Sequence, residues 1–266
     1  GYKLGLNEFS DLTQEEFSEK YKTIPIRKQT LQNLTLTSFI NDTHIPEQFD
    51  YRQVGYKTGI KLQQRCGGCY GIVTANMIEG AIWKKTGKLI PLSAQEIIDC
   101  SYSQGNIGCK GGNMPNSLDY VIENNGILSE ECYKFEDKDQ SCQTDKYNKT
   151  CERTQIRGIY NVSEGDEDDL AIALINYGPV GAGIDISASD FKQYRSGIYD
   201  NINCTSSGIS HAVLIVGFGY DSEQKKEFWV IQNSWGVSWG QNGLMQLARH
   251  SQDRCGISSY AFAAVV

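Results

Sequence analysis

The chain contains nine cysteines, and this odd number constrains its fold more than any other feature. Eight cysteines suffice for four disulfide bridges, which persist in oxidising compartments. One thiol is then left over, and such a residue is either an intermolecular linker or a reactive group. The candidate is Cys69, within Gln-Gln-Arg-Cys-Gly-Gly-Cys-Tyr at 63–70, with Ser-His-Ala at 210–212 and Asn-Ser-Trp-Gly at 233–236 downstream. A cysteine followed by a histidine and an asparagine in this order favours the reactive interpretation.

Length and composition limit the possible classes of protein. A chain of 266 residues with 39% hydrophobic and 21% charged residues can form one large domain or two lobes with a sizeable core. A net charge of −7 argues against a nucleic-acid partner, because phosphate binding requires clustered Lys and Arg. No apolar run approaches the ~18 residues of a membrane span, so we expect no membrane partner.

Several features predict a secretory route. The chain starts at Gly1, without Met or a signal sequence, so we expect a fragment whose first residues were removed. Four bridges indicate an oxidising compartment. Five N-x-Ser/Thr sequons are glycosylation candidates, and with the cysteines they predict a secreted or endolysosomal protein: Asn33, Asn41, Asn148, Asn161 and Asn203.

The first half of the chain has helical patterns. After Cys69, apolar residues recur at helical spacing, and Gly87 is a plausible stop. A second helix is predicted over Ser93–Asp99, where Ser93 and the Glu three residues later form a capping box. A third helix is predicted over Pro115–Asn125, before a glycine.

The second half has short β-type runs bounded by Gly, Pro and Asn. These runs are Val180–Ile186, Ala212–Phe218 and Phe228–Gln232, and one helix is predicted at Glu167–Tyr177. Helices first and strands later indicate an α+β arrangement of two lobes. A cleft between lobes is the usual place for a substrate site.

The position of Cys69 before a helix favours a thiolate, because the positive end of the helix dipole stabilises negative charge. One alternative is a redox CxxC formed by Cys66 and Cys69, but the preceding residues 61–65 are polar rather than a buried strand. A zinc site is weaker still, because there is no second CxxC or His pair. We expect no cofactor and no metal.

The three motifs together resemble those of the papain-like cysteine peptidases, the cathepsin family, and the resemblance covers nearly the whole chain. Gly-Gly before Cys69 and Gln-Gln upstream are most similar to the cathepsin O and L branches. The resemblance implies a papain-like two-lobe α+β fold with the cleft between the lobes. The peptidase domain would span 45–266, with a helical lobe over about 55–155 and a β-barrel-like lobe over about 156–266. The start at Ile45–Arg52 is similar to the family's mature amino terminus.

The amino-terminal residues resemble the end of the family's inhibitory propeptide. They contain the pattern Gly-x-Asn-x-Phe-x-Asp at 5–11, followed by a predicted short helix at Gln14–Phe17. Residues 1–44 would then be a propeptide remnant and linker, and the chain a truncated zymogen. The alternative is an N-terminal arm that only packs on the domain.

The resemblance assigns roles to four residues. Cys69 would be the nucleophile and His211 the base that pairs with it. Asn233 would orient the imidazole, shielded from water by Trp235. The side-chain amide of Gln63 would donate to the oxyanion that forms during attack on a peptide carbonyl.

Four positions depart from the usual family pattern. Gln64 stands where Gly is usual, Gly68 where Ser is usual, Tyr70 where Trp is commonest, and Ser210 where Asp is frequent. None of these changes removes a reacting group. They bear on the rate, the shape of the cleft and the pH profile.

Eight cysteines allow about a hundred pairings, so the pairing cannot be chosen from the sequence alone. The family resemblance implies three bridges, and the remaining two cysteines would form a fourth. The pairs would be Cys66–Cys109, Cys100–Cys142, Cys204–Cys255 and Cys132–Cys151.

The resemblance also implies a substrate cleft. Gly111 and Gly112 belong to a glycine segment where a peptide backbone can approach closely, and a structural turn is the alternative. The pocket for the second residue before the scissile bond would be apolar and prefer Leu, Val or Phe. It would be lined by Met114, Pro115, Gly183, Ile209 and Tyr260.

We therefore expect a cysteine endopeptidase, because no long insertion lies between Cys109 and Cys142, where the carboxydipeptidase branch carries an occluding loop. Its partners would be protein and peptide substrates, its own propeptide as inhibitor and cystatin-type inhibitors, and it would be a monomer. Two rivals remain: a catalytically weak homologue that acts as a binding protein, and a disulfide-rich structural or redox protein.

Overall fold

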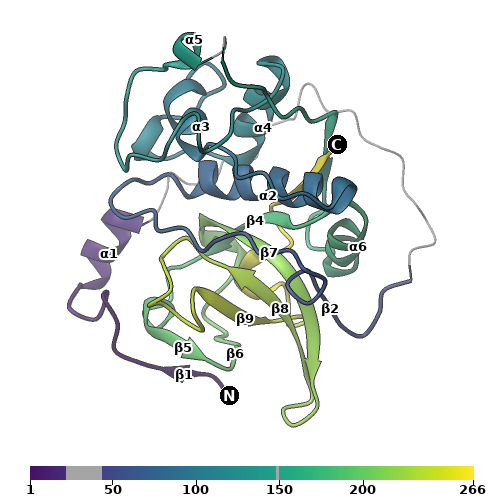
Figure 1. Cartoon of the computed structure of the whole chain (residues 1–266). Coiled ribbons are helices and arrows are strands. Elements are labelled where there is room, and N and C mark those ends of the chain that lie inside the picture. The colour runs from purple at the N-terminus through teal and green to yellow at the C-terminus, as the bar shows by residue number, and fades with distance from the viewer. Residues whose placement is uncertain (22–43, 148–149) are drawn as a thin grey trace.

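The computed structural model describes residues 1–21, 44–147 and 150–266. A long central helix lies between a group of helices and a large sheet, as Figure 1 shows. The α+β prediction is confirmed. The helices are α1 Gln14–Tyr21, α2 Cys69–Thr86, α3 Ala94–Cys100, α4 Met114–Glu123, α5 Thr144–Tyr147 and α6 Glu167–Tyr177.

Helix α2 is the central element, and its packing explains why it is buried. Every residue from Cys69 to Ala81 is buried, including the polar Thr74, Asn76 and Glu79, because the helix packs against the other helices on one side and the sheet on the other. The helix ends at Gly87, which has a φ of 72° and whose N–H donates to the carbonyl oxygen of Trp83. Glycine adopts this left-handed conformation without steric cost.

The helices around α2 begin at side-chain caps. The Ser93 hydroxyl accepts from the N–H of Glu96 at 3.0 Å, which is one half of the predicted capping box. The Glu96 carboxylate does not return to Ser93; instead it accepts from the N–H of Leu128 at 2.7 Å. Helix α4 starts one residue before the predicted proline, and the Asn113 side chain caps it. These caps satisfy N–H groups that a helix start leaves without partners.

In the described ranges, eight strands form one mixed sheet. Its order is β3-β10-β4-β7-β8-β9-β6, and β2 also pairs with β7. The expected barrel-like lobe is not a closed barrel, because the terminal strands β3 and β6 lie at opposite ends of this order. A separate two-stranded sheet joins β1 to β5. The strands are β1 Lys3–Leu4, β2 Phe49–Asp50, β3 Gly158–Asn161, β4 Val180–Asp185, β5 Tyr194–Ser196, β6 Ile198–Tyr199, β7 Ile209–Asp221, β8 Lys226–Gln232, β9 Leu244–Ala248 and β10 Ala261–Val265.

Strand β7 separates two hydrophobic cores. Successive side chains on a strand point to opposite faces, so alternate residues enter different cores. Val213 and Ile215 belong to the core of the β lobe, which also contains Trp235. Ala212 and Leu214 belong to the core shared with α2 and the other helices. The strand therefore places neighbouring residues in the two halves of the molecule.

The amino-terminal residues pack on the β lobe, as the purple segment in Figure 1 shows. Strand β1 pairs with β5 in antiparallel orientation. The Asn7 side-chain amide donates to the carbonyl oxygen of Lys192 at 2.8 Å. Three aromatic rings of this segment lie edge-on to Trp235, with ring centroids 5.3–5.6 Å away: Phe9, Phe17 and Tyr21.

Four disulfides connect the described residues; three are the pairs that the family resemblance implies, and Cys132–Cys151 is the pair that remained. They are Cys66–Cys109, Cys100–Cys142, Cys132–Cys151 and Cys204–Cys255. Cys69 lies outside all four. None of the helices in the described ranges has the length and apolar character needed to cross a membrane.

Candidate active site

The nucleophile candidate Cys69 is the first residue of α2, and its side chain is fully buried. Its Sγ atom lies at the positive end of the helix dipole. The N–H of Ala212 on β7 donates to this Sγ at 3.5 Å. Helix dipole and N–H both favour negative charge on sulfur, because each stabilises the thiolate more than the neutral thiol.

His211 directly precedes Ala212 on β7, so the same strand brings the imidazole and the N–H to the sulfur. The Nε2 atom of His211 lies 2.8 Å from Oδ1 of Asn233. This Oδ1 also accepts from the N–H of Ser234 at 2.8 Å, which identifies it as the amide oxygen. Nε2 must therefore carry the proton in this bond. The Nδ1 atom has no hydrogen-bond partner among the described residues.

An aromatic ring covers His211, which is itself fully buried. Trp235 is fully buried, and its ring centroid lies 4.9 Å from that of the imidazole. Burial lowers the pKa of His211 to about 4, although the bond to Asn233 opposes this shift. Desolvation disfavours the imidazolium, so a charged His211 requires a nearby negative charge.

Gln63 belongs to a tight turn over Gln63–Cys66, which we call the oxyanion turn after the role that the family resemblance predicts for Gln63. The N–H of Cys66 donates to the carbonyl oxygen of Gln63 at 3.1 Å, and Gln64 has a φ of 48°. The Gln63 side chain is fully buried. Its Oε1 accepts from the Ser234 hydroxyl at 2.7 Å, and its Nε2 donates to the Cys66 carbonyl oxygen at 3.2 Å. These two bonds orient the amide.

The glycine segment lies beside the same turn. The Cys66–Cys109 disulfide joins them, and the N–H of Gly67 donates to the carbonyl oxygen of Cys109 at 2.8 Å. A Cβ on Gly112 would lie 2.8 Å from the Tyr70 ring, so this position has no space for a side chain. Gly111 has a φ of 126°, which is a glycine conformation.

The predicted pocket residues come from both lobes. Met114 and Pro115 start α4 and are buried, and Ile209 starts β7. The N–H of Gly183 on β4 donates to the carbonyl oxygen of Tyr260 at 2.8 Å. Gly183 also pairs with Ala212, and this places the pocket residues of the β lobe next to the histidine strand.

The remaining site predictions concern metals and glycans. Among the described residues, no group of three or more His, Cys, Asp and Glu side chains could hold a metal ion. The sequon residues Asn161 and Asn203 are exposed. The other three candidates, Asn33, Asn41 and Asn148, lie outside the described residues.

A model described as "Papain family cysteine protease" matches residues 45–265. The chain belongs to this family.

Relatives of this papain-family protease match along almost its whole length. Mouse cathepsin S is 38% identical over 263 residues, which covers 97% of this chain and 75% of the relative. Mouse cathepsin K is 38% identical over 261 residues, which covers 98% of this chain and 77% of the relative. The structure of digestive procathepsin L 3 from Tenebrio molitor superposes with a TM-score of 0.87 at 32% identity, covering 100% of this chain and 83% of that one.

Two contacts of the protease were missed from the sequence. Ser234 holds the Gln63 amide, and its place inside Asn-Ser-Trp-Gly was the available signal. The N–H of Ala212 reaches Cys69 through the backbone, so no side-chain pattern could have indicated it.

Proposed function

We propose that this papain-family protease is an endopeptidase that acts through a Cys69 thiolate and a His211 imidazolium. One observation carries the proposal: α2 and β7 meet so that the N–H next to His211 donates to Cys69 Sγ, while Asn233 holds the other side of the imidazole. Thiol, base and orienting amide are the groups that nucleophilic peptide hydrolysis requires.

The two reacting groups depend on each other. A buried, isolated His211 would be neutral above about pH 4, where its pKa lies. Transfer of the Cys69 proton to Nδ1 creates a thiolate beside an imidazolium, and each charge stabilises the other. The pair therefore titrates as one unit, and its macroscopic pKa values belong to both residues.

In the acylation step, Cys69 Sγ attacks the carbonyl carbon of the peptide bond, and a C–S bond forms. Negative charge develops on the carbonyl oxygen. The Gln63 amide and the N–H of Cys69 donate to this oxygen. His211 then gives its Nδ1 proton to the amide nitrogen, the C–N bond breaks, and the amine product leaves.

In the deacylation step, a water molecule attacks the thioester carbonyl while His211 accepts one of its protons. The C–S bond breaks, the acid product leaves, and the proton remains shared within the Cys69–His211 pair. Asn233 keeps the ring in one orientation through both steps, because Nε2 donates to its Oδ1 in either charge state of the ring.

Substrate preference would come from the apolar pocket predicted from the family resemblance. Met114 and Tyr260 are buried members of one hydrophobic cluster with Ala212, and Ile209 packs against it. This surrounding favours Leu, Val or Phe as the second residue before the scissile bond. The absence of an insertion between Cys109 and Cys142 leaves the cleft open for endopeptidase cleavage.

Residues 1–44 are proposed as a propeptide remnant with linker, and 45–266 as the peptidase domain. The packing of Phe9 and Phe17 around Trp235 supports this division, as do the proforms among the structural neighbours. The enzyme would be a secreted or endolysosomal monomeric glycoprotein. Its partners would be peptide substrates, its propeptide and cystatin-type inhibitors.

The test is labelling at mildly acidic pH with an epoxide inhibitor of thiol proteases, followed by peptide mapping. We expect one adduct on Cys69 and parallel loss of hydrolysis of a fluorogenic Leu or Val peptide. The Cys69→Ala variant should lose hydrolysis by about four orders of magnitude or more. Labelling should be repeated after removal of residues 1–44, because that segment is proposed to be a remnant of the inhibitory propeptide.

The rival binding-protein function predicts the opposite result. No adduct and no hydrolysis, even after removal of residues 1–44, would refute the peptidase proposal. An unchanged biological effect of Cys69→Ala would then support binding. A preference for Arg, rather than Leu or Val, as the second residue before the scissile bond would refute the pocket assignment alone.

A further inference from the structure

The oxyanion turn presents two backbone donors on its outer side. The N–H groups of Arg65 and Cys66 follow one another in the chain and converge on one oxygen, Oδ1 of Asp137, at 3.0 and 3.1 Å. Successive N–H groups in a turn form a concave site for an anion. The turn contains Gln64 with a positive φ, which is the left-handed conformation that such sites require.

The backbone conformation of Asp137 brings its carboxylate to this turn. Its carboxylate is partly buried, and its backbone has a φ of 55°. Hydrogen bonds from backbone N–H groups to an ionised carboxylate are stronger than those between neutral groups. The contact joins residues far apart in the chain, so it fixes one loop relative to another.

The loop that carries Asp137 is itself held on α3. Gln95 donates through Nε2 to the carbonyl oxygen of Lys138 at 2.8 Å and accepts through Oε1 from the N–H of Glu136 at 2.8 Å. One side chain therefore holds the residues on both sides of Asp137. These bonds fix the position of the Asp137 carboxylate relative to α3.

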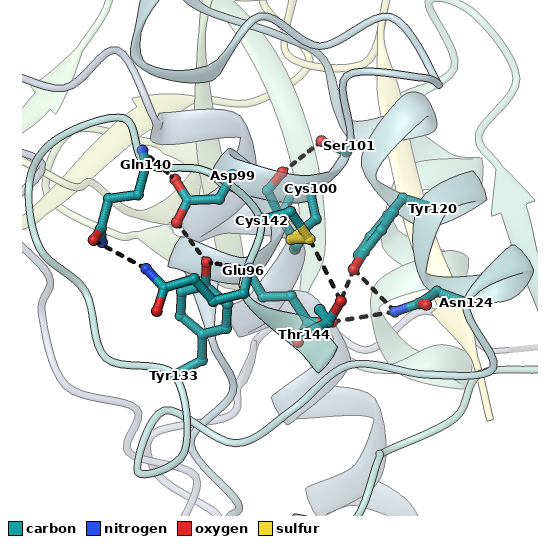
Figure 2. Close-up of a disulfide and its surroundings, with 12 residues drawn as sticks. Glu96, Asp99, Cys100, Ser101, Tyr120, Asn124, Tyr133, Gln140, Cys142 and Thr144 are labelled. Carbon is teal, nitrogen blue, oxygen red and sulfur yellow. Dashed lines mark hydrogen bonds between the residues drawn. A yellow bond between two sulfur atoms is a disulfide. The ribbon is translucent and has the colours of Figure 1, made fainter. Parts of the chain in front are cut away.

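Further anchors of this loop are visible in Figure 2. Asp99 on α3 accepts from the N–H of Gln140 at 3.0 Å and from the Tyr133 hydroxyl at 2.7 Å. The Cys100–Cys142 disulfide ties the next part of the loop to the end of the same helix. The carboxylate thus extends from a rigid support rather than from a freely moving segment.

Cys66 connects this support to the proposed oxyanion donor. Its N–H is shared between Asp137 Oδ1 and the carbonyl oxygen of Gln63, and its own carbonyl oxygen accepts from Nε2 of Gln63 at 3.2 Å. Movement of the Cys66 peptide groups would therefore move the Gln63 amide. Catalysis by an oxyanion hole depends on donors fixed at the place where the charge develops, and small displacements reduce the rate.

We propose that Asp137 is a positioning residue for the oxyanion turn. Its carboxylate accepts hydrogen bonds from two N–H groups of the oxyanion turn. The oxyanion turn then fixes the position of the Gln63 side-chain amide. The inference rests on the proposed peptidase function, because it assigns Asp137 to the oxyanion step of that reaction.

The test separates oxyanion stabilisation from the reactivity of the thiolate. Hydrolysis of a peptide builds an oxyanion, whereas alkylation of Cys69 by iodoacetamide is a direct displacement that builds none. We expect Asp137→Ala to lower kcat about tenfold, with KM and the alkylation rate within about twofold of wild type. Asp137→Asn should recover most of kcat, because one amide oxygen can accept from both N–H groups.

Two further variants serve as controls. Asp137→Gly removes the carboxylate but relieves the positive φ, so it should match Asp137→Ala if the hydrogen bonds are responsible. Lys138→Ala changes the neighbouring exposed side chain, and it should behave as wild type.

The outcomes distinguish the two proposals. Wild-type kcat in Asp137→Ala, or equal losses of kcat and alkylation rate, would overturn the positioning role. So would a full recovery in Asp137→Gly, because backbone strain would then be the cause of the loss. A wild-type enzyme that is alkylated at Cys69 but hydrolyses no peptide would instead overturn the proposed function, and the role of Asp137 with it.

Discussion

The two halves of the candidate site are held by different forces. The Cys69 half lies at the start of α2 and is held by directional polar contacts, among them those of the Asp137 carboxylate, and by the covalent Cys66–Cys109 bridge. The His211 half lies on β7 and is covered by aromatic rings, above all Trp235. One half is supported by hydrogen bonds to the backbone, and the other by packing.

This difference follows from what each half must do. An oxyanion hole needs backbone and amide donors at fixed angles, which only directional contacts can provide. An imidazole that pairs with a thiolate needs a dry environment, because water would weaken the attraction between the charges. Burial also lowers the pKa of His211, so in the proposed mechanism the imidazolium depends on the Cys69 thiolate for its stability.

Removal of the Trp235 ring should have the largest effect on stability and activity. A small effect would contradict the conclusion that packing supports the His211 half of the site. Trp235→Ala should lower the free energy of unfolding by about 3–5 kcal/mol. It should also lower kcat per titrated active site, because water would reach the His211–Asn233 bond. Urea denaturation and active-site titration measure the two effects.

Trp229→Ala is the matched control for this prediction. Trp229 is equally buried in the same hydrophobic core, but its indole N–H donates to Glu167 at 2.7 Å rather than covering the imidazole. The Trp229→Ala variant should lower the free energy of unfolding by a similar amount without changing kcat per active site. Equal losses of kcat in both variants would mean that the cover of Trp235 has no specific role.

An intermediate effect is expected in the pH dependence of the unfolding free energy of the Cys69→Ala variant. The pKa of His211 is about 4 in the folded state and 6.5 in the reference state. As the pH falls through 6.5, the unfolded chain binds the proton first, so the folded state loses stability down to about pH 4. The titration of His211 should therefore lower the free energy of unfolding by about 2 kcal/mol between pH 7 and pH 5.

The double variant Cys69→Ala/His211→Gln isolates this contribution, since other titrating groups remain the same. Stability at each pH comes from chemical denaturation, and the difference between the two variants is the quantity of interest. A difference that stays constant from pH 7 to pH 5 would show that burial does not control His211.

The smallest effect is expected in the oxyanion turn. Gln64 has a φ of 48°, where a residue with a Cβ is strained. Gln64→Gly should therefore raise the free energy of unfolding by about 0.5–1 kcal/mol and leave kcat unchanged. Arg65→Gly, at the next position without a positive φ, should lower it by a similar amount. Destabilisation by Gln64→Gly would mean that the side chain, not the turn, explains this departure from the family pattern.

Local patterns in the sequence predicted the family and every α-helix of the described residues except the short α5. The helical spacing after Cys69 and the stop at Gly87 match α2, and Glu167–Tyr177 matches α6, because each depends on neighbours in the chain. Strand β7 is longer than the predicted Ala212–Phe218, since its polar ends at Ser210 and Tyr220 mask the pattern.

Contacts between distant loops could not be predicted. No strand was predicted for β9 or β10, whose short runs only become strands by pairing with β8, β3 and β4. The contact of Asp137 with the oxyanion turn depends on how Gln95 folds the intervening loop. Such a contact has no period or spacing in the sequence.

The closeness of Cys66 to Cys69 has a consequence for oxidative folding. Cys109 must form its bridge with Cys66, although a second thiol lies only three residues further along the chain. Formation of α2 before oxidation would protect against the wrong bridge, because it fixes Cys69 in the first turn of the helix while Cys66 lies in the preceding turn beside Cys109. A swapped Cys69–Cys109 bridge would have the same mass and a normal thiol count, yet it would lack a nucleophile. If Cys69 is the nucleophile as proposed, the order of folding and oxidation would set the fraction of chains that are active.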